Sequence, residues 1–217
     1  MAEVKKTTIY MVRHGQSEGN KVRAFLGHTD LDLTEKGHKQ AENVAEFLSD
    51  VPVDVIYSSD LKRAYSTAVH TAEKKKLEII KTLGLREIYA GEWEGMLFDD
   101  IEREFKESYG IWLTNIGNAV CDGGESVAEL RQRVVSEMKK IAEENTGKTI
   151  FVFTHATVIR VFKNYCDGNG IDKMKEVPWA PNASVTKVEY SDEGFVVIEY
   201  GNDSFQGEFS STVPANV

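Results

Sequence analysis

The amino-acid sequence predicts an α/β fold with three layers, α/β/α, around a mostly parallel central sheet. Short apolar and β-branched runs alternate with helix-like segments along most of the 217 residues. Such alternation is typical of parallel sheets with helices on both faces. The alternation stops once, over residues 89–124, where glycines, aromatic residues and charges mix. We therefore predict one domain over residues 1–217, with a lid-like insertion at about 89–124.

The first half of the chain supplies three predicted strands and two helices. Residues 7–12 predict a strand, and residues 34–48 predict a helix that Thr34 can cap. The segment VDVIYSS, residues 53–59, predicts the second strand. A helix follows over residues 61–76, in which Ala64, Ala68 and Ala72 form a small-residue stripe that can pack closely on a sheet. Residues 77–88 contain the third short strand.

The second half repeats this pattern after the insertion, in which we expect at most two short helical stretches. Ser126 and Glu129 form a capping box at the start of a helix that we expect to end at Gly147. Residues 148–155 predict a buried strand, and residues 156–166 predict a helix. Residues 183–190 and 195–201 flank the turn SDEG and predict a β-hairpin.

Composition narrows the range of partners. The net charge is −9, whereas nucleic acids and anionic membranes require a basic surface. No apolar run approaches the roughly 18 residues that a membrane span needs. Cys121 and Cys166 lie far apart and match neither a disulfide framework nor a zinc motif, which fits a reducing compartment. We expect a cytoplasmic protein without nucleic-acid or membrane partners, metal or cofactor, and we leave a homodimer open.

Charged and imidazole side chains stand where several predicted strands end. Arg13 and His14 follow the first strand, and Arg63 lies in the first turn of the helix after the second. Glu87 follows the third strand, and His155 ends the strand over residues 148–155. Because functional crevices in such sheets lie outside the carboxyl ends of the strands, we expect these five side chains to converge.

These residue types together can bind and transfer a phosphoryl group. Arginine forks match phosphate oxygens, and nearby positive charge keeps an imidazole neutral at pH 7. A neutral imidazole that faces phosphorus is a nucleophile, and a carboxylic acid can protonate the leaving oxygen. Each group also has a simpler interpretation by itself. Arg63 can pair with Asp60 on its own helix, His155 can be a structural histidine, and Glu87 can be a surface carboxylate.

The segment VRHGQSEGN resembles the signature of the histidine phosphatase superfamily, which has the phosphoglycerate mutase-like fold. The resemblance continues in the same order through GHTDLDLTEKGHKQA, YSSDLKRAYSTA, LREIYAGEWEG, GGESVAELRQRV and FVFTHATVIR. It implies that His14 is a nucleophile that becomes phosphohistidine and that Glu87 is the proton donor. Arg13, Arg63 and His155 would bind the phosphoryl group with help from Asn20. Gln16 and Ser17 would lie in the phosphate loop.

The resemblance also shows one departure and leaves two alternatives. Ala156 and Thr157 stand where the family commonly has glycines, which affects the expected shape of the pocket. The insertion carries only the cations Arg103 and Lys106 and lacks the arginine pair usual in the family's mutases, so it looks like the phosphatase branch. We therefore expect a metal-independent phosphomonoesterase that acts on a small phosphorylated metabolite with broad specificity.

A cofactor-dependent phosphoglycerate mutase is the first alternative. Lys21 and Arg23, just after Asn20, can reach a second anion at the pocket rim, as that activity requires. The second alternative is a phosphate-binding regulatory module that does not catalyse. The presence of both His14 and Glu87 argues against this module, because a degenerate member would be expected to lose one of them.

Overall fold

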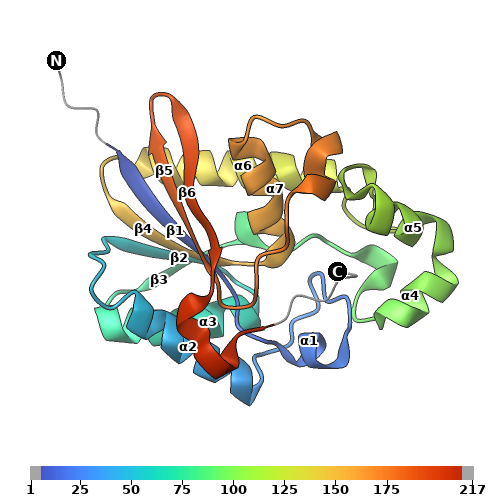
Figure 1. Cartoon of the computed structure of the whole chain (residues 1–217), viewed down its shortest axis with the longest axis horizontal. Coiled ribbons are helices and arrows are strands. Elements are labelled where there is room, and N and C mark those ends of the chain that lie inside the picture. Colours follow the sequence, from blue (N-terminus) through green and yellow to red (C-terminus); the bar gives the residue numbers. More distant parts are fainter. Residues whose placement is uncertain (1–5, 212–217) are drawn as a thin grey trace.

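A six-stranded sheet forms the centre of the computed structural model, which describes residues 6–211 (Figure 1). The strand order is β3-β2-β4-β1-β5-β6. The strands are β1 (Thr7–Arg13), β2 (Val55–Ser59), β3 (Ile79–Thr82), β4 (Thr149–Thr154), β5 (Val185–Ser191) and β6 (Gly194–Asn202). The first four run parallel, and β5 and β6 pair antiparallel. The predicted α/β fold with a mostly parallel sheet is therefore confirmed.

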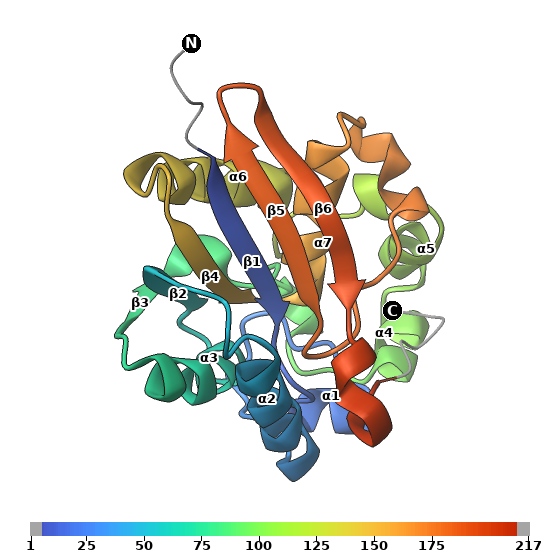
Figure 2. The same ribbon diagram turned by 60° about the vertical axis from the view of Figure 1, so that its left-hand side comes forward.

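Helices cover both faces of the sheet, as Figures 1 and 2 show. One face carries α2 (Glu35–Phe47) and α3 (Lys62–Lys75), and the other carries α6 (Val127–Glu144) and α7 (Ala156–Cys166). Thr34 caps α2 by accepting a hydrogen bond from the Gly37 N–H at 3.0 Å. Ser126 and Glu129 form the predicted capping box of α6. That helix ends at Glu144, with Asn145 as its cap, three residues before the predicted Gly147.

Alternate side chains of the central strands enter two separate hydrophobic cores. In β4, Ile150 and Val152 pack toward α6 and α7, whereas Phe151 and Phe153 pack toward α2 and α3. Two alanines of the stripe in α3, Ala68 and Ala72, belong to the core between the sheet and helices α2 and α3, and Ala68 is fully buried there. Because a strand buried on both faces needs apolar residues at every position, β4 reads TIFVFT without polar alternation.

The segment over residues 89–124 lies beside the sheet rather than on either face (Figure 1). It contains the α-helices α4 (Phe98–Glu104) and α5 (Lys106–Thr114), and the single 3₁₀ turns η2 (Gly91–Trp93) and η3 (Ile116–Asn118). At most two short helical stretches were predicted here, and the 3₁₀ turns come in addition to them. The fully buried Trp93 holds the segment together, because its ring meets the rings of Phe25 and Trp112 edge to face.

Outside that segment, four further short elements have no counterpart in the sequence-based prediction. These are α1 (Glu18–Val22), η1 (Leu83–Leu85), η4 (Ile171–Glu176) and η5 (Ser204–Phe209). Elements this short depend on tertiary contacts rather than on helical periodicity. In η5, for example, Gln206 donates to the carbonyls of Gln40 and Ala183, and Phe205 stacks on Phe47 at 4.1 Å. Residues 212–217, at the C-terminal end of the sequence, lie outside the described residues.

No helix within residues 6–211 combines the length and apolarity that crossing a bilayer requires.

Candidate active site

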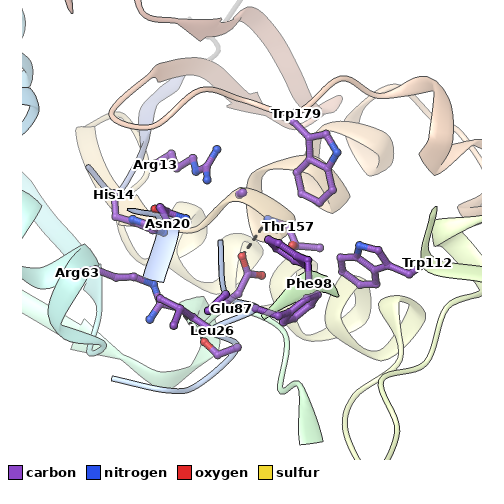
Figure 3. Close-up of a pocket in the computed structure, with 14 residues that line it drawn as sticks. Arg13, His14, Asn20, Leu26, Arg63, Glu87, Phe98, Trp112, Thr157 and Trp179 are labelled. Atoms are coloured by element: carbon purple, nitrogen blue, oxygen red, sulfur yellow. Dashed lines mark hydrogen bonds between the residues drawn. The ribbon is translucent and has the colours of Figure 1, made fainter. Parts of the chain in front are cut away.

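A pocket lies at the carboxyl ends of the parallel strands, and its two sides differ in chemistry (Figure 3). Polar groups gather on one side and at the base: Arg13, His14, Asn20, Arg63, Glu87 and Thr157. The remaining lining is small or apolar: Ala24, Phe25, Leu26, Gly27, Phe98, Trp112, Ala156 and Trp179. In Figure 3 the indole rings of Trp112 and Trp179 lie across the pocket from Arg13 and His14.

His14 is anchored by backbone contacts from both of its neighbours in the sheet. Its N–H donates to the Thr154 carbonyl at the end of β4, at 2.9 Å. Its carbonyl accepts from the Ala183 N–H, at 3.1 Å, just before β5 begins. The residue is only 4% exposed. The first strand therefore ends between a parallel and an antiparallel neighbour, which together fix the position of the imidazole.

The His14 ring has one nitrogen committed and one available. Nδ1 lies 2.7 Å from the carbonyl oxygen of Gly15. Because a carbonyl can only accept a hydrogen bond, Nδ1 carries the proton, and the lone pair of Nε2 stays free. Burial, followed by the charges of Arg63 and Arg13, holds the pKa of His14 well below its usual value. The ring is therefore neutral at pH 7 and can act as a nucleophile.

Gly15 is required by a close approach of two backbones. A Cβ at this position would lie 2.5 Å from the carbonyl oxygen of Gly37 in α2. The Gly15 N–H donates to the hydroxyl of Thr67, which in turn donates to the carbonyl of Arg63. The loop after β1 is thus packed against α2 and tied to α3.

Two buried arginines supply positive charge to the pocket. Arg63 is 1% exposed and donates to the carbonyls of Thr29 and Gly27, at 2.9 and 2.8 Å. Arg13 donates from Nη1 to the carbonyl of Ala180 at 2.6 Å. Burial lowers the pKa of each arginine to about 10, and the charge of Glu87 partly offsets that effect. Both guanidinium groups are consequently charged at neutral pH.

His155 lies beside His14 but does not itself line the pocket. Its ring centroid is 5.2 Å from that of His14, and its Nε2 is 2.8 Å from the Ser59 hydroxyl at the end of β2. Burial, and then the charge of Arg63, depresses the pKa of His155 well below its ordinary value. Two buried nitrogens of this cluster, His155 Nδ1 and Arg13 Nε, have no hydrogen-bond partner among the described residues. Buried polar atoms usually have partners, so these two suit a polar ligand.

Glu87 is the carboxylate that lines the pocket. It follows the 3₁₀ turn η1, which continues β3, and it is half-buried. One carboxylate oxygen accepts from the Ile88 N–H at 2.8 Å, and the other accepts from the Thr157 N–H at 3.2 Å. These two backbone donors orient the carboxyl group toward the pocket, where Figure 3 shows it between the polar and aromatic sides.

The loop and helix after Gly15 place one further polar side chain in the pocket. Asn20 Oδ1 accepts from the Ser17 N–H, the Ser17 hydroxyl and the Asn182 amide, each at 3.1 Å. With its oxygen occupied in this way, Asn20 can offer its NH₂ group to a ligand. Ser17 itself caps α1, and the Gln16 side chain accepts from the Thr34 hydroxyl at 2.9 Å. Neither Ser17 nor Gln16 lines the pocket.

Two of the predicted binding residues are not part of the pocket lining, and their role in binding a second anion stays a prediction. Lys21 and Arg23 are exposed and do not line it. Arg23 ends the five-residue helix α1 in the left-handed conformation, with φ of 61°. The Arg23 carbonyl accepts from the N–H of Phe98, a lining residue, at 3.1 Å, so this residue lies beside the pocket wall. Ala156 and Thr157, by contrast, line the base of the pocket at the start of α7.

The simpler interpretation of Arg63 is also wrong. Asp60 pairs with Arg86, whose Nε donates to Oδ1 at 2.7 Å. This pair holds the pKa of Asp60 below its usual value. Arg63 instead donates to the backbone carbonyls of Thr29 and Gly27, and it lines the pocket.

Three residues at the site were not identified from sequence. Asn182 donates to the carbonyl of His14 at 3.1 Å as well as to Asn20, so it braces both. Thr67 lies one helical turn after Arg63, a spacing that could have indicated a shared role. Trp179 also lines the pocket. Nothing in the pattern around Asn182 or Trp179 indicated their positions, because both lie in an irregular segment.

The arrangement is suited to an anion rather than to a metal. Two guanidinium groups, an amide and an imidazole face the same space, with one carboxylate beside them. Within residues 6–211 no group of three or more histidine, cysteine, aspartate or glutamate side chains is close enough to hold a metal ion. A phosphoryl group would match the forked donors and the adjacent nucleophile.

Comparison with known proteins agrees with this chemistry. The model of the histidine phosphatase superfamily (branch 1) matches residues 9–203. Phosphoserine phosphatase 1 of Hydrogenobacter thermophilus is 35% identical over 202 residues, which are 93% of this chain and 95% of that protein. Adenosylcobalamin/alpha-ribazole phosphatase of Salmonella typhimurium is 31% identical over 151 residues, 70% of this chain and 75% of that protein.

A solved structure shows the same architecture. Bacillus stearothermophilus YhfR superposes with a TM-score of 0.88 at 28% identity, over 92% of this chain and 98% of that chain. The family model spans nearly all of the described sheet, from β1 to the end of β6. The chain belongs to branch 1 of the histidine phosphatase superfamily, and it is a phosphatase of that superfamily.

Proposed function

We propose that this protein is a metal-independent phosphomonoesterase that hydrolyses small phosphorylated metabolites through a phosphohistidine at His14. The observation that carries the proposal is the neutral His14 ring, whose Nε2 lone pair is free beside two buried arginines. A nucleophile without a proton, next to a phosphate-binding fork, needs only a proton donor for the leaving group.

The proposed reaction has two steps. First, Nε2 of His14 attacks phosphorus, and the bond from phosphorus to the leaving oxygen breaks. The leaving oxygen takes a proton from Glu87, which reacts in its protonated form, and departs as an alcohol. Second, water attacks the phosphohistidine and gives a proton to the Glu87 carboxylate. The phosphorus–nitrogen bond breaks, inorganic phosphate leaves, and both side chains return to their starting states.

The surrounding groups would stabilise the transferring phosphoryl group. Arg13 and Arg63 are buried and already held by backbone carbonyls, so they need little reorganisation when charge shifts to the equatorial oxygens. His155 Nδ1 and Arg13 Nε would gain the partners that they lack among the described residues. The NH₂ group of Asn20 would complete the set of donors.

Two observations favour hydrolysis over the mutase alternative. A mutase must hold a second anionic group over the pocket, and neither Lys21 nor Arg23 lines it. Arg103, in α4, forms ion pairs with Asp100 and Glu104 at the surface. We further propose that residues 89–124 act as a lid, because α4 and α5 supply Phe98 and Trp112 to the pocket wall.

The substrate class is small phosphorylated metabolites. Relatives in the family are named for phosphoserine and for alpha-ribazole phosphate chemistry, and such names support a compact monoester. The space within the pocket, its open mouth included, is about 480 Å³, which fits a leaving group of that size.

The test is release of phosphate from p-nitrophenyl phosphate by the wild-type protein and by His14→Ala. We expect turnover by the wild type, loss of it in the variant, and an acid-labile, base-stable phosphoryl group on His14 after rapid quenching. Circular dichroism should show that the variant is folded. Unchanged turnover in His14→Ala would contradict the mechanism. Faster interconversion of phosphoglycerates than release of phosphate would favour the mutase.

A further inference from the structure

The side of the pocket that would receive the leaving group is built from aromatic rings. Trp112 and Trp179 face each other there, with ring centroids 6.5 Å apart and planes inclined by 32° (Figure 3). Phe98 and Leu26 continue the wall toward the mouth. Trp112 is almost fully buried and is braced by Phe25, whereas Trp179 is only half-buried, so part of its ring stays accessible.

Full charges among the described lining residues are confined to the phosphate end of the pocket. They are the guanidinium groups of Arg13 and Arg63 and the carboxyl group of Glu87. All three are assigned to the phosphoryl group or to the proton transfer. A carboxylate or ammonium group on the leaving alcohol would lose water against apolar rings and gain no partner there.

A buried arginine stacks on Trp179 and holds it in place. The guanidinium carbon of Arg160, in α7, lies 4.2 Å from the centre of the Trp179 ring. Arg160 is 5% exposed and donates to the carbonyls of Val177 and Met174, at 2.6 and 3.0 Å. Two backbone contacts and a stacking contact thus fix the orientation of the indole ring before any substrate arrives.

A fixed ring is a better binding surface than a mobile one. Ordering a large side chain costs free energy upon binding, and Arg160 has already restricted Trp179. Part of the half-buried Trp179 ring stays exposed at the pocket, where a flat apolar group can contact it. Trp179 would therefore contact the substrate, and Arg160 would act through Trp179 as a positioning residue.

We propose that Trp179, positioned by Arg160, makes this enzyme select phosphate monoesters whose leaving alcohol carries a flat aromatic or apolar group. The proposal rests on the phosphomonoesterase function above and narrows its substrate class. The proposed preference differs from the phosphoserine substrate that the name of the relative phosphoserine phosphatase 1 suggests. The serine leaving group carries an ammonium and a carboxylate group, and the aromatic side of the pocket offers no charged partner for either.

Three monoesters of primary alcohols test the proposal while keeping the leaving oxygen similar: 2-phenylethyl phosphate, ethyl phosphate and phosphoserine. We expect the wild type to show kcat/KM about tenfold or more higher for 2-phenylethyl phosphate than for the other two, from ring burial and stacking. Trp179→Leu should reduce this ratio about tenfold, chiefly through KM for 2-phenylethyl phosphate. Trp179→Phe should retain most of the ratio.

Arg160→Met should also lower the ratio of kcat/KM for 2-phenylethyl phosphate to kcat/KM for ethyl phosphate, because the indole of Trp179 loses the guanidinium that positions it. The kcat for ethyl phosphate should be kept, because this substrate does not depend on the indole. The matched control is Tyr165→Leu. Tyr165 is likewise half-buried on α7 near an arginine, with Arg131 at 5.8 Å, and it does not line the pocket. Its removal should leave the ratio unchanged. Thermal unfolding of each variant checks that it is folded.

Non-hydrolysable phosphonates separate failure of this proposal from failure of the phosphatase function. Calorimetry on the wild type should show tighter binding of 2-phenylethylphosphonate than of ethylphosphonate, with the difference reduced by Trp179→Leu. Equal affinities and equal kcat/KM values, or a preference for phosphoserine, would overturn the selectivity. A clear phosphonate preference without any hydrolysis would uphold the aromatic site and overturn the proposed function.

Discussion

The imidazole rings of His14 and His155 lie 5.2 Å apart at an angle of 60°, and both are buried beside Arg63. Burial and that guanidinium charge depress both pKa values. The folded protein therefore keeps two neutral imidazoles in a pH range where the unfolded chain protonates them. This difference in bound protons makes both the activity and the stability of the fold depend on pH in a predictable direction.

The first prediction concerns stability at acid pH. Below about pH 6.5 the unfolded state binds protons at these two imidazoles while the folded state does not. The free energy of unfolding should therefore fall as pH falls from 6.5, by up to about 1.4 kcal/mol per pH unit for each imidazole. Urea unfolding at pH 7, 6 and 5 measures the slope. His14→Ala should remove the contribution of one imidazole to this pH dependence of the unfolding free energy. An unchanged slope in that variant would contradict the depressed pKa of His14.

Glu87→Gln should separate substrates by the quality of their leaving group. Loss of a general acid costs about 10²- to 10⁴-fold where the leaving oxygen needs a proton. We expect that range for an alkyl phosphate and a much smaller loss for p-nitrophenyl phosphate, whose phenolate leaves without help. Steady-state kcat on both substrates provides the comparison. Equal losses would show that Glu87 does not protonate the leaving oxygen.

Gly15→Ala should damage both the loop after β1 and activity. The added methyl group would lie 2.5 Å from the Gly37 carbonyl, so either the loop or α2 has to move. Overpacking of this kind typically costs about 1–3 kcal/mol, and the shift would displace His14. Gly110→Ala is the matched control, because a Cβ at that position in α5 meets no atom within 4 Å. The control should keep activity and gain up to about 1 kcal/mol of stability.

Gln40→Met should loosen the same loop through its contacts with α2. The fully buried Gln40 accepts from the Gln16 N–H at 2.7 Å and donates to the Phe209 carbonyl at 2.7 Å. Methionine keeps the volume and leaves both groups without a partner, at a cost of about 1–3 kcal/mol in unfolding free energy. Urea unfolding and kcat test this. Lys39→Met, at an exposed position beside it, should change stability by less than about 0.5 kcal/mol.

Activity should survive incubation with EDTA. The positive charge opposite the phosphate comes from Arg13 and Arg63, which a chelator does not remove. Phosphate release from p-nitrophenyl phosphate before and after dialysis against EDTA is the measurement, with a metal-dependent phosphatase treated in parallel. A strong loss that added divalent cation restores would contradict the proposed mechanism.

The sequence predicted the polar end of the pocket because that end is built from strand ends. Parallel strands place their carboxyl ends at one edge, so residues such as His14, Arg63 and His155 meet although they are far apart in the chain. The aromatic end follows no such rule. Trp179 lies in an irregular segment between η4 and β5, and its position depends on a contact with Arg160 that no local pattern encodes.

The limits of the sequence-based site prediction have the same physical origin. Lys21 and Arg23 follow Asn20 closely in sequence, yet neither belongs to the pocket lining. The direction of a side chain after a five-residue helix depends on the final dihedral angles, and Arg23 adopts a left-handed one. The support from Asn182 was missed for a similar reason, since a hydrogen bond across 168 positions leaves no trace in periodicity.

The division of the pocket between two kinds of segment has an evolutionary consequence. Phe98 and Trp112 come from short helices outside the sheet, so mutations there can alter substrate choice without disturbing the chemistry. Trp179 is different, because the next residue, Ala180, receives the hydrogen bond of Arg13. Descendants of this protein should therefore diversify most readily at position 98, because Phe98 is only half-buried. Trp112 belongs to the buried core, and position 179 directly precedes the residue whose carbonyl holds Arg13, so change at both positions should be constrained.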